Sequence, residues 1–370
     1  MKLAAAALLV CLVLLSKREP RAAEARALEN CLRQGRESAR CLDSVFAEWL
    51  SRSTAEEALA LIRTRQANDH EFRLVCHPVV HALGRALFQR AGTIHDAFKA
   101  CDPTCHSGCY HGVVERFLWG ETSADGAPVH VSRPLLERKA AGACADDAPL
   151  RLRFQCLHGL GHAILYFAGY DLAAALAICD RLSDPWSQRS CYGGVFMENV
   201  AGASAEKRAV SATDYHYPCN QVADRHRAEC YLMQTSRMIE MGLPLEALFG
   251  ECAKAGAFYA ECAQSIGRDL SNEARVHGPE KAAEKCALAP GVGRQACIRG
   301  VLYALVDNTW DGSYALPFCA ALQESDALAH CFDLATRYLQ ELFDHAPEEI
   351  ARQCKRYLAD PTFCRARAER

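Results

Sequence analysis

The fold is predicted most clearly from the stretch GYDLAAALAICDRLSDPWSQRSCYGGVFMEN, residues 169–199. Its first part is rich in Ala and Leu and predicts an α-helix that ends at Cys179. After a short turn, a second segment begins at Cys191, with apolar residues at helical spacing. The stretch therefore predicts a helical hairpin with one cysteine on each side of its turn, placed so that a disulfide can staple the two helices.

Paired cysteines of this kind recur along the whole chain, which has 370 residues and 21 cysteines. Seven to eleven residues separate the partners, and from Cys101 to Cys354 the first partner advances by 33 to 43 residues, mostly by 33 to 35. A period near 34 is typical of helix–turn–helix arrays. The predicted staples are Cys31–Cys41, Cys101–Cys109, Cys144–Cys156, Cys179–Cys191, Cys219–Cys230, Cys252–Cys262, Cys286–Cys297, Cys319–Cys331 and Cys354–Cys364.

The segments that follow the second cysteine of each pair share one pattern. Positions +1, +4 and +8 from the cysteine are mostly apolar, and +3 is often Gly or another small residue. This spacing makes one apolar helical stripe, and the small residue would let a neighbouring helix approach closely. We therefore predict an all-α fold, an αα-solenoid of about ten repeats of ~34 residues, each hairpin stapled by a disulfide.

Two cysteines fall outside the staple pattern. The step from Cys31 to Cys101 spans two periods, so a first partner is missing near Gln66, and Cys76 stands where its second partner belongs. Cys105 is an extra cysteine inside the third repeat. We predict that Cys76 and Cys105 form a disulfide that ties the second repeat to the third.

The N-terminus indicates export. Lys2 precedes thirteen apolar residues, Leu3–Leu15, which are too few to span a bilayer comfortably. Residues 1–27 are therefore interpreted as a signal peptide or, alternatively, as an N-terminal membrane anchor, and residues 28–370 as the repeat domain. Dispersed cysteines favour an oxidising compartment, so the protein is expected in the periplasm, tethered to a membrane by this segment, or secreted. With a formal net charge of −3, the sequence does not suggest the basic surface that nucleic acid requires, and no nucleic-acid partner is expected.

Two repeats carry insertions, near residues 119–134 and 201–218. In helical arrays, insertions often map to the binding face. The concave face of such an array is also a natural groove for a peptide or protein partner. Its C-terminal repeats offer the aromatic residues Tyr303, Trp310 and Tyr314.

Histidines concentrate between residues 70 and 162 and predict a metal site. His111 and Glu115 stand at +2 and +6 from Cys109, and His158 and His162 stand at the same positions from Cys156. Residues four apart share a helix face, and equivalent positions on packed helices lie close together. These four side chains are therefore candidate ligands for zinc, copper, iron or manganese.

His77 and His81 form a further pair four residues apart, one step out of this register. They are candidate additional ligands, supporting groups around the metal, or buried structural histidines. The same flank of later repeats is polar, which is equally consistent with a solvated or peptide-binding face. If the site is catalytic, Glu115 is the candidate general base.

Covalent haem is not expected. Residues 101–106, CDPTCH, are one residue longer than the attachment motif CxxCH. Cys101 also stands at the position that the first staple cysteine occupies in the other repeats.

The segment AFKACDPTCHSGCYHGVV, residues 97–114, resembles the Sel1-like repeats of secreted cysteine-rich bacterial proteins. In that family a helix ends in a KAC run, and GCY begins the next helix with a staple between the two cysteines. The resemblance implies a right-handed αα superhelix that is exported and used for binding. Most repeats here lack the glycine-rich loop of the family, and a TPR-like array is the alternative.

The sequence thus predicts an exported helical-repeat binding protein with a His/Glu cluster for a transition metal. Two alternatives use the same residues differently. The cluster could serve a metal-dependent hydrolase or oxidoreductase, or the array could be a protein-interaction scaffold without metal.

Overall fold

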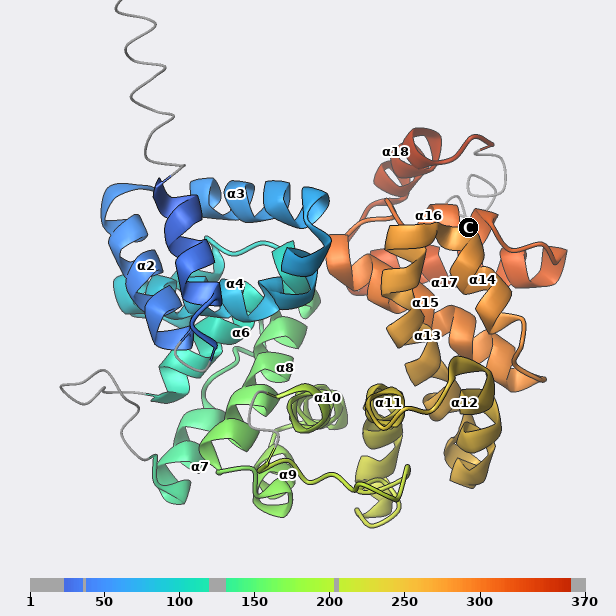
Figure 1. Ribbon diagram of the computed structural model, residues 1–370, viewed down its shortest axis with the longest axis horizontal. Helices are drawn as coiled ribbons and strands as arrows, with labels where there is room; N and C mark the ends of the chain where they lie inside the picture. The colour runs from blue at the N-terminus through green and yellow to red at the C-terminus, as the bar shows by residue number, and fades with distance from the viewer. Residues whose placement is uncertain (1–22, 36–37, 120–130, 203–205, 361–370) are drawn as a thin grey trace, which may run out of the picture. The chain divides into compact units, whose positions relative to one another are not determined.

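The computed structural model describes residues 23–35, 38–119, 131–202 and 206–360 (Figure 1). Every regular element in these ranges is a helix, which confirms the all-α class. No helix in the described ranges is long and apolar enough to cross a membrane. The first 22 residues of the predicted signal segment, and most of the first insertion, lie outside them. The chain divides into two compact units, residues 1–129 and 130–370.

The first unit is built around two long helices that pack against each other along their length, α4 and α6. Helices α2 and α3 cover α4, and the core between them includes the fully buried rings of Phe46, Trp49 and Phe72. Side chains of Thr54, Asp69 and Thr93 cap α3, α4 and α5. The helices are α2 (Ser38–Arg52), α3 (Ala55–Asn68), α4 (His70–Ala91), α5 (Ile94–Phe98) and α6 (Thr104–Trp119).

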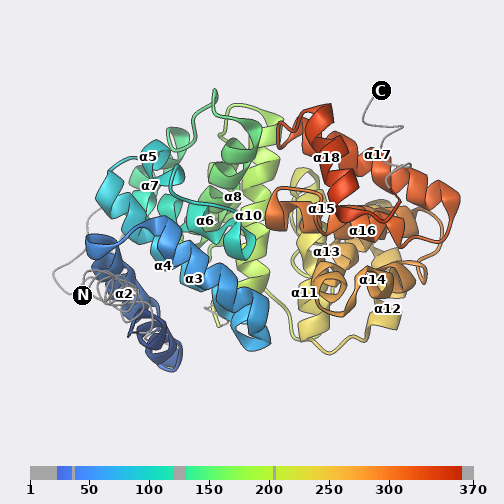
Figure 2. The same cartoon turned by 90° about the horizontal axis from the view of Figure 1, so that it is seen from above.

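The second unit mostly alternates short and long helices. Each long helix contacts the next long one, from α8 to α10, α11, α13, α15 and α17 (Figure 2). The elements are α7 (Arg133–Ala141), α8 (Leu150–Phe167), α9 (Leu172–Cys179), α10 (Pro185–Ala201), α11 (Asp224–Glu240), α12 (Leu245–Cys252), η2 (Ala253–Phe258), α13 (Tyr259–His277), α14 (Pro279–Cys286), α15 (Val292–Thr309), α16 (Ala315–Ala320), α17 (Ser325–Glu341) and α18 (Pro347–Tyr357).

Nine disulfides join cysteines of the described residues, and each joins a pair that the spacing of the cysteines predicts. Eight are staples with partners 8 to 12 positions apart. The ninth joins Cys76 of α4 to Cys105 of α6, 29 positions later. Closing a loop of about 12 residues stabilises the folded chain by roughly 3 kcal/mol. Cys364, the expected partner of Cys354, lies outside the described residues.

Glycines set the distance between the long helices, as the small residue at +3 predicts. A Cβ added to Gly112 of α6 would lie 2.0 Å from the carbonyl oxygen of His81 in α4. In return, a Cβ on Gly84 of α4 would lie 2.0 Å from the carbonyl oxygen of Cys109. Any larger residue would push the two backbones apart.

The same reciprocal arrangement occurs at two further helix pairs. In α8/α10, a Cβ on Gly161 or Gly194 would lie 2.1 or 1.9 Å from a carbonyl oxygen of the other helix. In α13/α15, the corresponding distance is 2.0 Å for both Gly267 and Gly300. We call these three the glycine-paired helices: α4/α6, α8/α10 and α13/α15.

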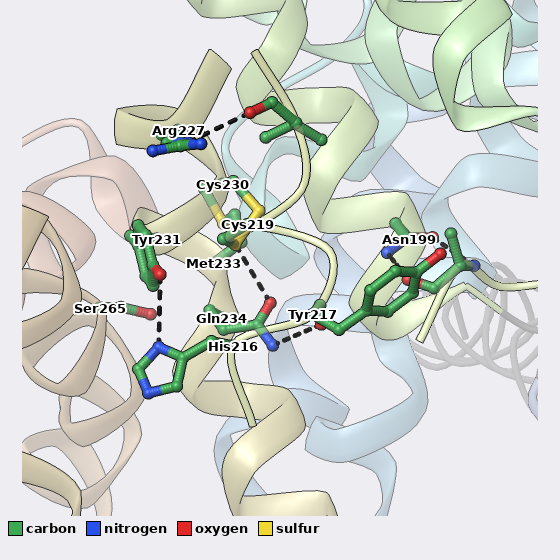
Figure 3. The surroundings of a disulfide bond; sticks show 12 residues. Asn199, His216, Tyr217, Cys219, Arg227, Cys230, Tyr231, Met233, Gln234 and Ser265 are labelled. Atoms are coloured by element: carbon green, nitrogen blue, oxygen red, sulfur yellow. Dashed lines mark hydrogen bonds between the residues drawn. A yellow bond between two sulfur atoms is a disulfide. The ribbon is translucent and has the colours of Figure 1, made fainter. Parts of the chain in front are cut away.

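One repeat departs from the predicted hairpin. Residues 206–223 contain no helix, so the Cys219–Cys230 disulfide joins a loop, not a short helix, to α11 (Figure 3). The side-chain amide of Gln234 donates hydrogen bonds to the carbonyl oxygens of Tyr215 and Tyr217, at 2.7 and 2.9 Å. These bonds satisfy loop carbonyls that a helix would pair internally. The described part of the second insertion is therefore anchored to α11.

Candidate metal centre

Three histidines of the first unit converge where α4 and α6 are in close contact. His77 and His81 lie one turn apart on α4, and His111 comes from α6. Each offers a ring nitrogen, and these three atoms lie within 4.8 Å of one another. His81 and His111 are buried, whereas His77 is half-buried.

The spacing of the three rings suits a single metal ion. Ring centroids are 4.6 Å apart for His77 and His81, 5.4 Å for His77 and His111, and 5.5 Å for His81 and His111. Imidazole nitrogens bound tetrahedrally at about 2.0–2.1 Å place neighbouring ring centroids about 5 Å apart. The rings therefore need only small adjustments to share one ion.

Polar contacts show which nitrogen of each α4 histidine faces an acceptor and which faces the other histidine. Nδ1 of His77 lies 2.7 Å from the carbonyl oxygen of Cys105, which only accepts hydrogen bonds. Nδ1 of His81 lies 3.4 Å from a carboxylate oxygen of Glu115. Both Nδ1 atoms therefore carry the proton, and both Nε2 atoms carry lone pairs.

These two Nε2 atoms are 3.0 Å apart. Two lone pairs at this distance repel each other unless a cation, either a proton or a metal ion, lies between them. In metal sites, a carbonyl or carboxylate on the other ring nitrogen is the usual way to orient a histidine ligand.

The carboxylate behind His81 is itself held firmly. Arg85 donates to Glu115 at 2.7 Å and to Asp43 at 2.8 Å. Burial alone would raise the pKa of Glu115, but the contacts with His81 and with the Arg85 guanidinium outweigh it and hold the pKa well below its usual range. Glu115 is therefore ionised, and it contacts His81 as an orienting group on the side away from His77.

A strained turn supports His77. Cys105, His106 and Ser107 have φ values of 53°, 58° and 59°, three consecutive left-handed residues that are not glycine. Each costs about 1–2 kcal/mol relative to ordinary helix. The turn is held by the Cys76–Cys105 disulfide, next to His77 in sequence, and it points the Cys105 carbonyl at the His77 ring.

His158 and His162 belong to the second unit, on α8. Their ring centroids are 5.0 Å apart, and Nδ1 of His162 lies 3.1 Å from Glu198, which also accepts a hydrogen bond from Tyr170 at 2.5 Å. Burial and then the neighbouring His162 lower the pKa of His158 well below its usual range. Within the described ranges, the group of three potential ligands is His77, His81 and His111, without Glu115, His158 or His162.

The glycines carry a sequence signal for this grouping. His81 and His158 each stand three residues before a paired glycine, Gly84 or Gly161, whereas they stand five and two residues after a cysteine. Counting from the glycines therefore makes α8 equivalent to α4, and not to α6. The histidine of α6 is then expected to meet α4.

Comparison with known proteins finds no matching family model, no similar curated protein and no similar solved structure.

Proposed function

We propose that this protein binds one transition-metal ion through His77, His81 and His111. The observation that carries the proposal is the 3.0 Å separation of the two Nε2 atoms while each Nδ1 faces an acceptor. A shared proton would satisfy two imidazoles, whereas a metal ion uses all three. Of the ligands predicted from the sequence, the proposed site keeps His111 and takes the candidate additional ligands His77 and His81 as its partners.

The donor set narrows the choice of metal. Three neutral imidazoles suit zinc, copper, iron and manganese, and nitrogen sites bind copper and zinc more tightly than iron or manganese. The nearby cysteines, Cys76 and Cys105, are joined in a disulfide and offer no thiolate. We therefore infer zinc or copper as the ion.

The proposal includes the finer description of the fold. The contacts between successive long helices in the second unit and the staples favour a right-handed αα-solenoid of the Sel1-like or TPR-like kind. Nine disulfides are typical of an oxidising, extracellular type of compartment. An exported array of this kind would bind a protein or peptide partner as well as the ion.

Elemental analysis tests the metal directly. The full chain, produced in an oxidising compartment, should carry one equivalent of zinc or copper, and His111→Ala should lose it. His95→Ala removes an exposed histidine of the same unit and is the matched control. A wild-type protein that neither contains nor takes up either metal would overturn the proposal.

A second variant set separates the two histidine groups. His158→Gln with His162→Gln should keep the metal, because His77, His81 and His111 all come from the first unit. Loss of the ion in this double variant, in a protein that still folds, would assign the site to α8.

A metal-dependent enzyme is the second candidate, favoured by the half-buried position of His77. Three histidines leave a coordination position in which a water molecule would become an effective nucleophile near neutral pH. Hydrolysis of activated esters by the metal-loaded protein, abolished by His111→Ala, would support this candidate.

A further inference from the structure

The left-handed turn places a fourth histidine beside the metal centre. The ring of His106 is exposed, and its centroid lies 6.4 Å from that of His77. Rings that share one ion lie about 5 Å apart, so His106 is roughly 1 Å too far from His77 to be a ligand as it stands. Rotation about the side-chain bonds of an exposed residue can supply a movement of this size.

The backbone of the turn offers a reason for its strain. Among the described residues, six that are not glycine have positive φ, and three of these are the consecutive residues Cys105, His106 and Ser107. Strain of this kind persists where the surroundings impose it, and it clusters at ligand clamps. Here the Cys76–Cys105 disulfide and the bond from His77 to the Cys105 carbonyl hold the turn.

The turn also packs so closely against α4 that position 108 has no room for a side chain. A Cβ on Gly108 would lie 2.7 Å from the Val80 side chain and 2.9 Å from Nδ1 of His77. The residue after the left-handed segment must therefore be glycine for the turn to rest on α4. The backbone of His106 is thereby held beside the three-histidine group, with its side chain exposed.

We propose that His106 is the fourth ligand of the metal ion, rotating inward when the ion binds and replacing the last water. The inference rests on the proposed function, because it requires the ion at His77, His81 and His111. It assigns a closed four-nitrogen site, which is a binding site and not a hydrolytic centre.

Cobalt(II) substitution of the full-length, disulfide-bonded protein tests this inference. The wild-type spectrum should be that of a tetrahedral four-nitrogen site and should not change on adding azide. His106→Asn removes the imidazole, and asparagine tolerates the left-handed backbone. This variant should bind cobalt and zinc at least about 10-fold more weakly, and its spectrum should respond to azide.

Two further variants complete the test. His106→Gly keeps the turn, and added imidazole should restore its wild-type cobalt spectrum. His95→Ala, the exposed control, should match the wild type. If His106→Asn keeps wild-type affinity and the wild-type spectrum already responds to azide, the fourth ligand is water and the inference is wrong. A wild type that binds no metal would instead overturn the proposed function itself.

Discussion

The helix pairs α4/α6 and α13/α15 share a backbone arrangement but carry different chemistry. In each, one glycine per helix meets a carbonyl oxygen of the other helix: Gly84 and Gly112 in the first pair, Gly267 and Gly300 in the second. The close approach is therefore a repeated structural device. It does not depend on histidine.

The side chains at the histidine positions differ between the two pairs. Counted from the glycines, His81 corresponds to Gln264, and His111 corresponds to Arg299. Nε of Arg299 donates to Oε1 of Gln264 at 2.7 Å, so an ordinary hydrogen bond occupies the place of the histidine group. The candidate metal centre is therefore a set of side chains added to a pair of helices whose close packing does not require them.

Breaking the disulfide of the first pair should have the largest effect. Cys76→Ser with Cys105→Ser opens a loop of 29 positions and should lower the free energy of unfolding by about 3–4 kcal/mol. It should also weaken metal binding at least about 10-fold, because the Cys105 carbonyl is no longer held against His77. Denaturant titration and metal titration measure the two effects.

The matched control breaks the staple that joins α12 to α13, the first helix of the other pair. Cys252→Ser with Cys262→Ser, at the start of α13, should cost about 3 kcal/mol of stability and leave metal affinity unchanged. Equal metal affinity in both double variants would show that the Cys76–Cys105 bond does not support the centre.

Adding one methyl group to a paired glycine should destabilise either helix pair. Gly112→Ala and Gly300→Ala should each lower the unfolding free energy by about 1–3 kcal/mol, because the new Cβ meets a backbone oxygen. The first should also displace the carbonyl of His81 and reduce metal uptake, whereas the second should not. Gly142→Ala is the control, because a Cβ there meets nothing within 4 Å.

The cysteine pattern predicts the helical hairpins because a disulfide forms only between cysteines that lie a short, fixed distance apart. A disulfide joins Cα atoms about 5.5 Å apart, so paired cysteines at regular intervals demand regular hairpins. The missing partner near Gln66 illustrates this, since α3 occupies the expected first-helix position without a cysteine. The insertion before Cys219 was foreseen, but the sequence did not show that it replaces the first helix of its repeat, because the loop is held by the side chain of Gln234, 19 and 17 residues after the carbonyls that it binds.

The candidate centre was only partly foreseeable. Phase counted from a cysteine gives the face of one helix but not the neighbour that this face meets. Counted from the cysteines, His81 is out of register with His158, because Cys76 lies eight residues before Gly84 whereas Cys156 lies five before Gly161; counted from the glycines, the two histidines are equivalent. Close approach of backbones, set by glycine, decides which histidines converge.

Removing the charge of Glu115, which contacts His81, should weaken metal binding, whereas a change at the equivalent position of α15 should not. Glu115→Gln should weaken zinc binding about 10–100-fold, because His81 loses the carboxylate that orients it and raises its basicity. Isothermal titration of zinc measures the loss. Tyr303 is the equivalent residue of α15, and Tyr303→Phe should bind zinc as the wild type does. Equal affinities for the two variants would contradict the orienting role of Glu115.

Transferring the histidines to the α13/α15 pair is expected to have the smallest effect, a second and weaker zinc site. Ala260→His, Gln264→His, Arg299→His and Tyr303→Glu reproduce, at equivalent positions of α13/α15, the side chains of the first pair. Arg268 already stands where Arg85 lies, one residue after the paired glycine. The variant should bind a second zinc ion, detectable by elemental analysis as a change from one equivalent to two.

The second site should be at least about 10-fold weaker than the first, since it lacks the left-handed turn whose Cys105 carbonyl orients His77. Placing the same four substitutions in a His111→Ala background separates the sites, because one equivalent should then remain. Loss of the Tyr303–Tyr338 stack, with centroids 4.1 Å apart, should cost about 0.5–1.5 kcal/mol and leave the frame folded. A folded variant without a second equivalent would mean that the glycine frame alone does not position the rings, and that the left-handed turn is required.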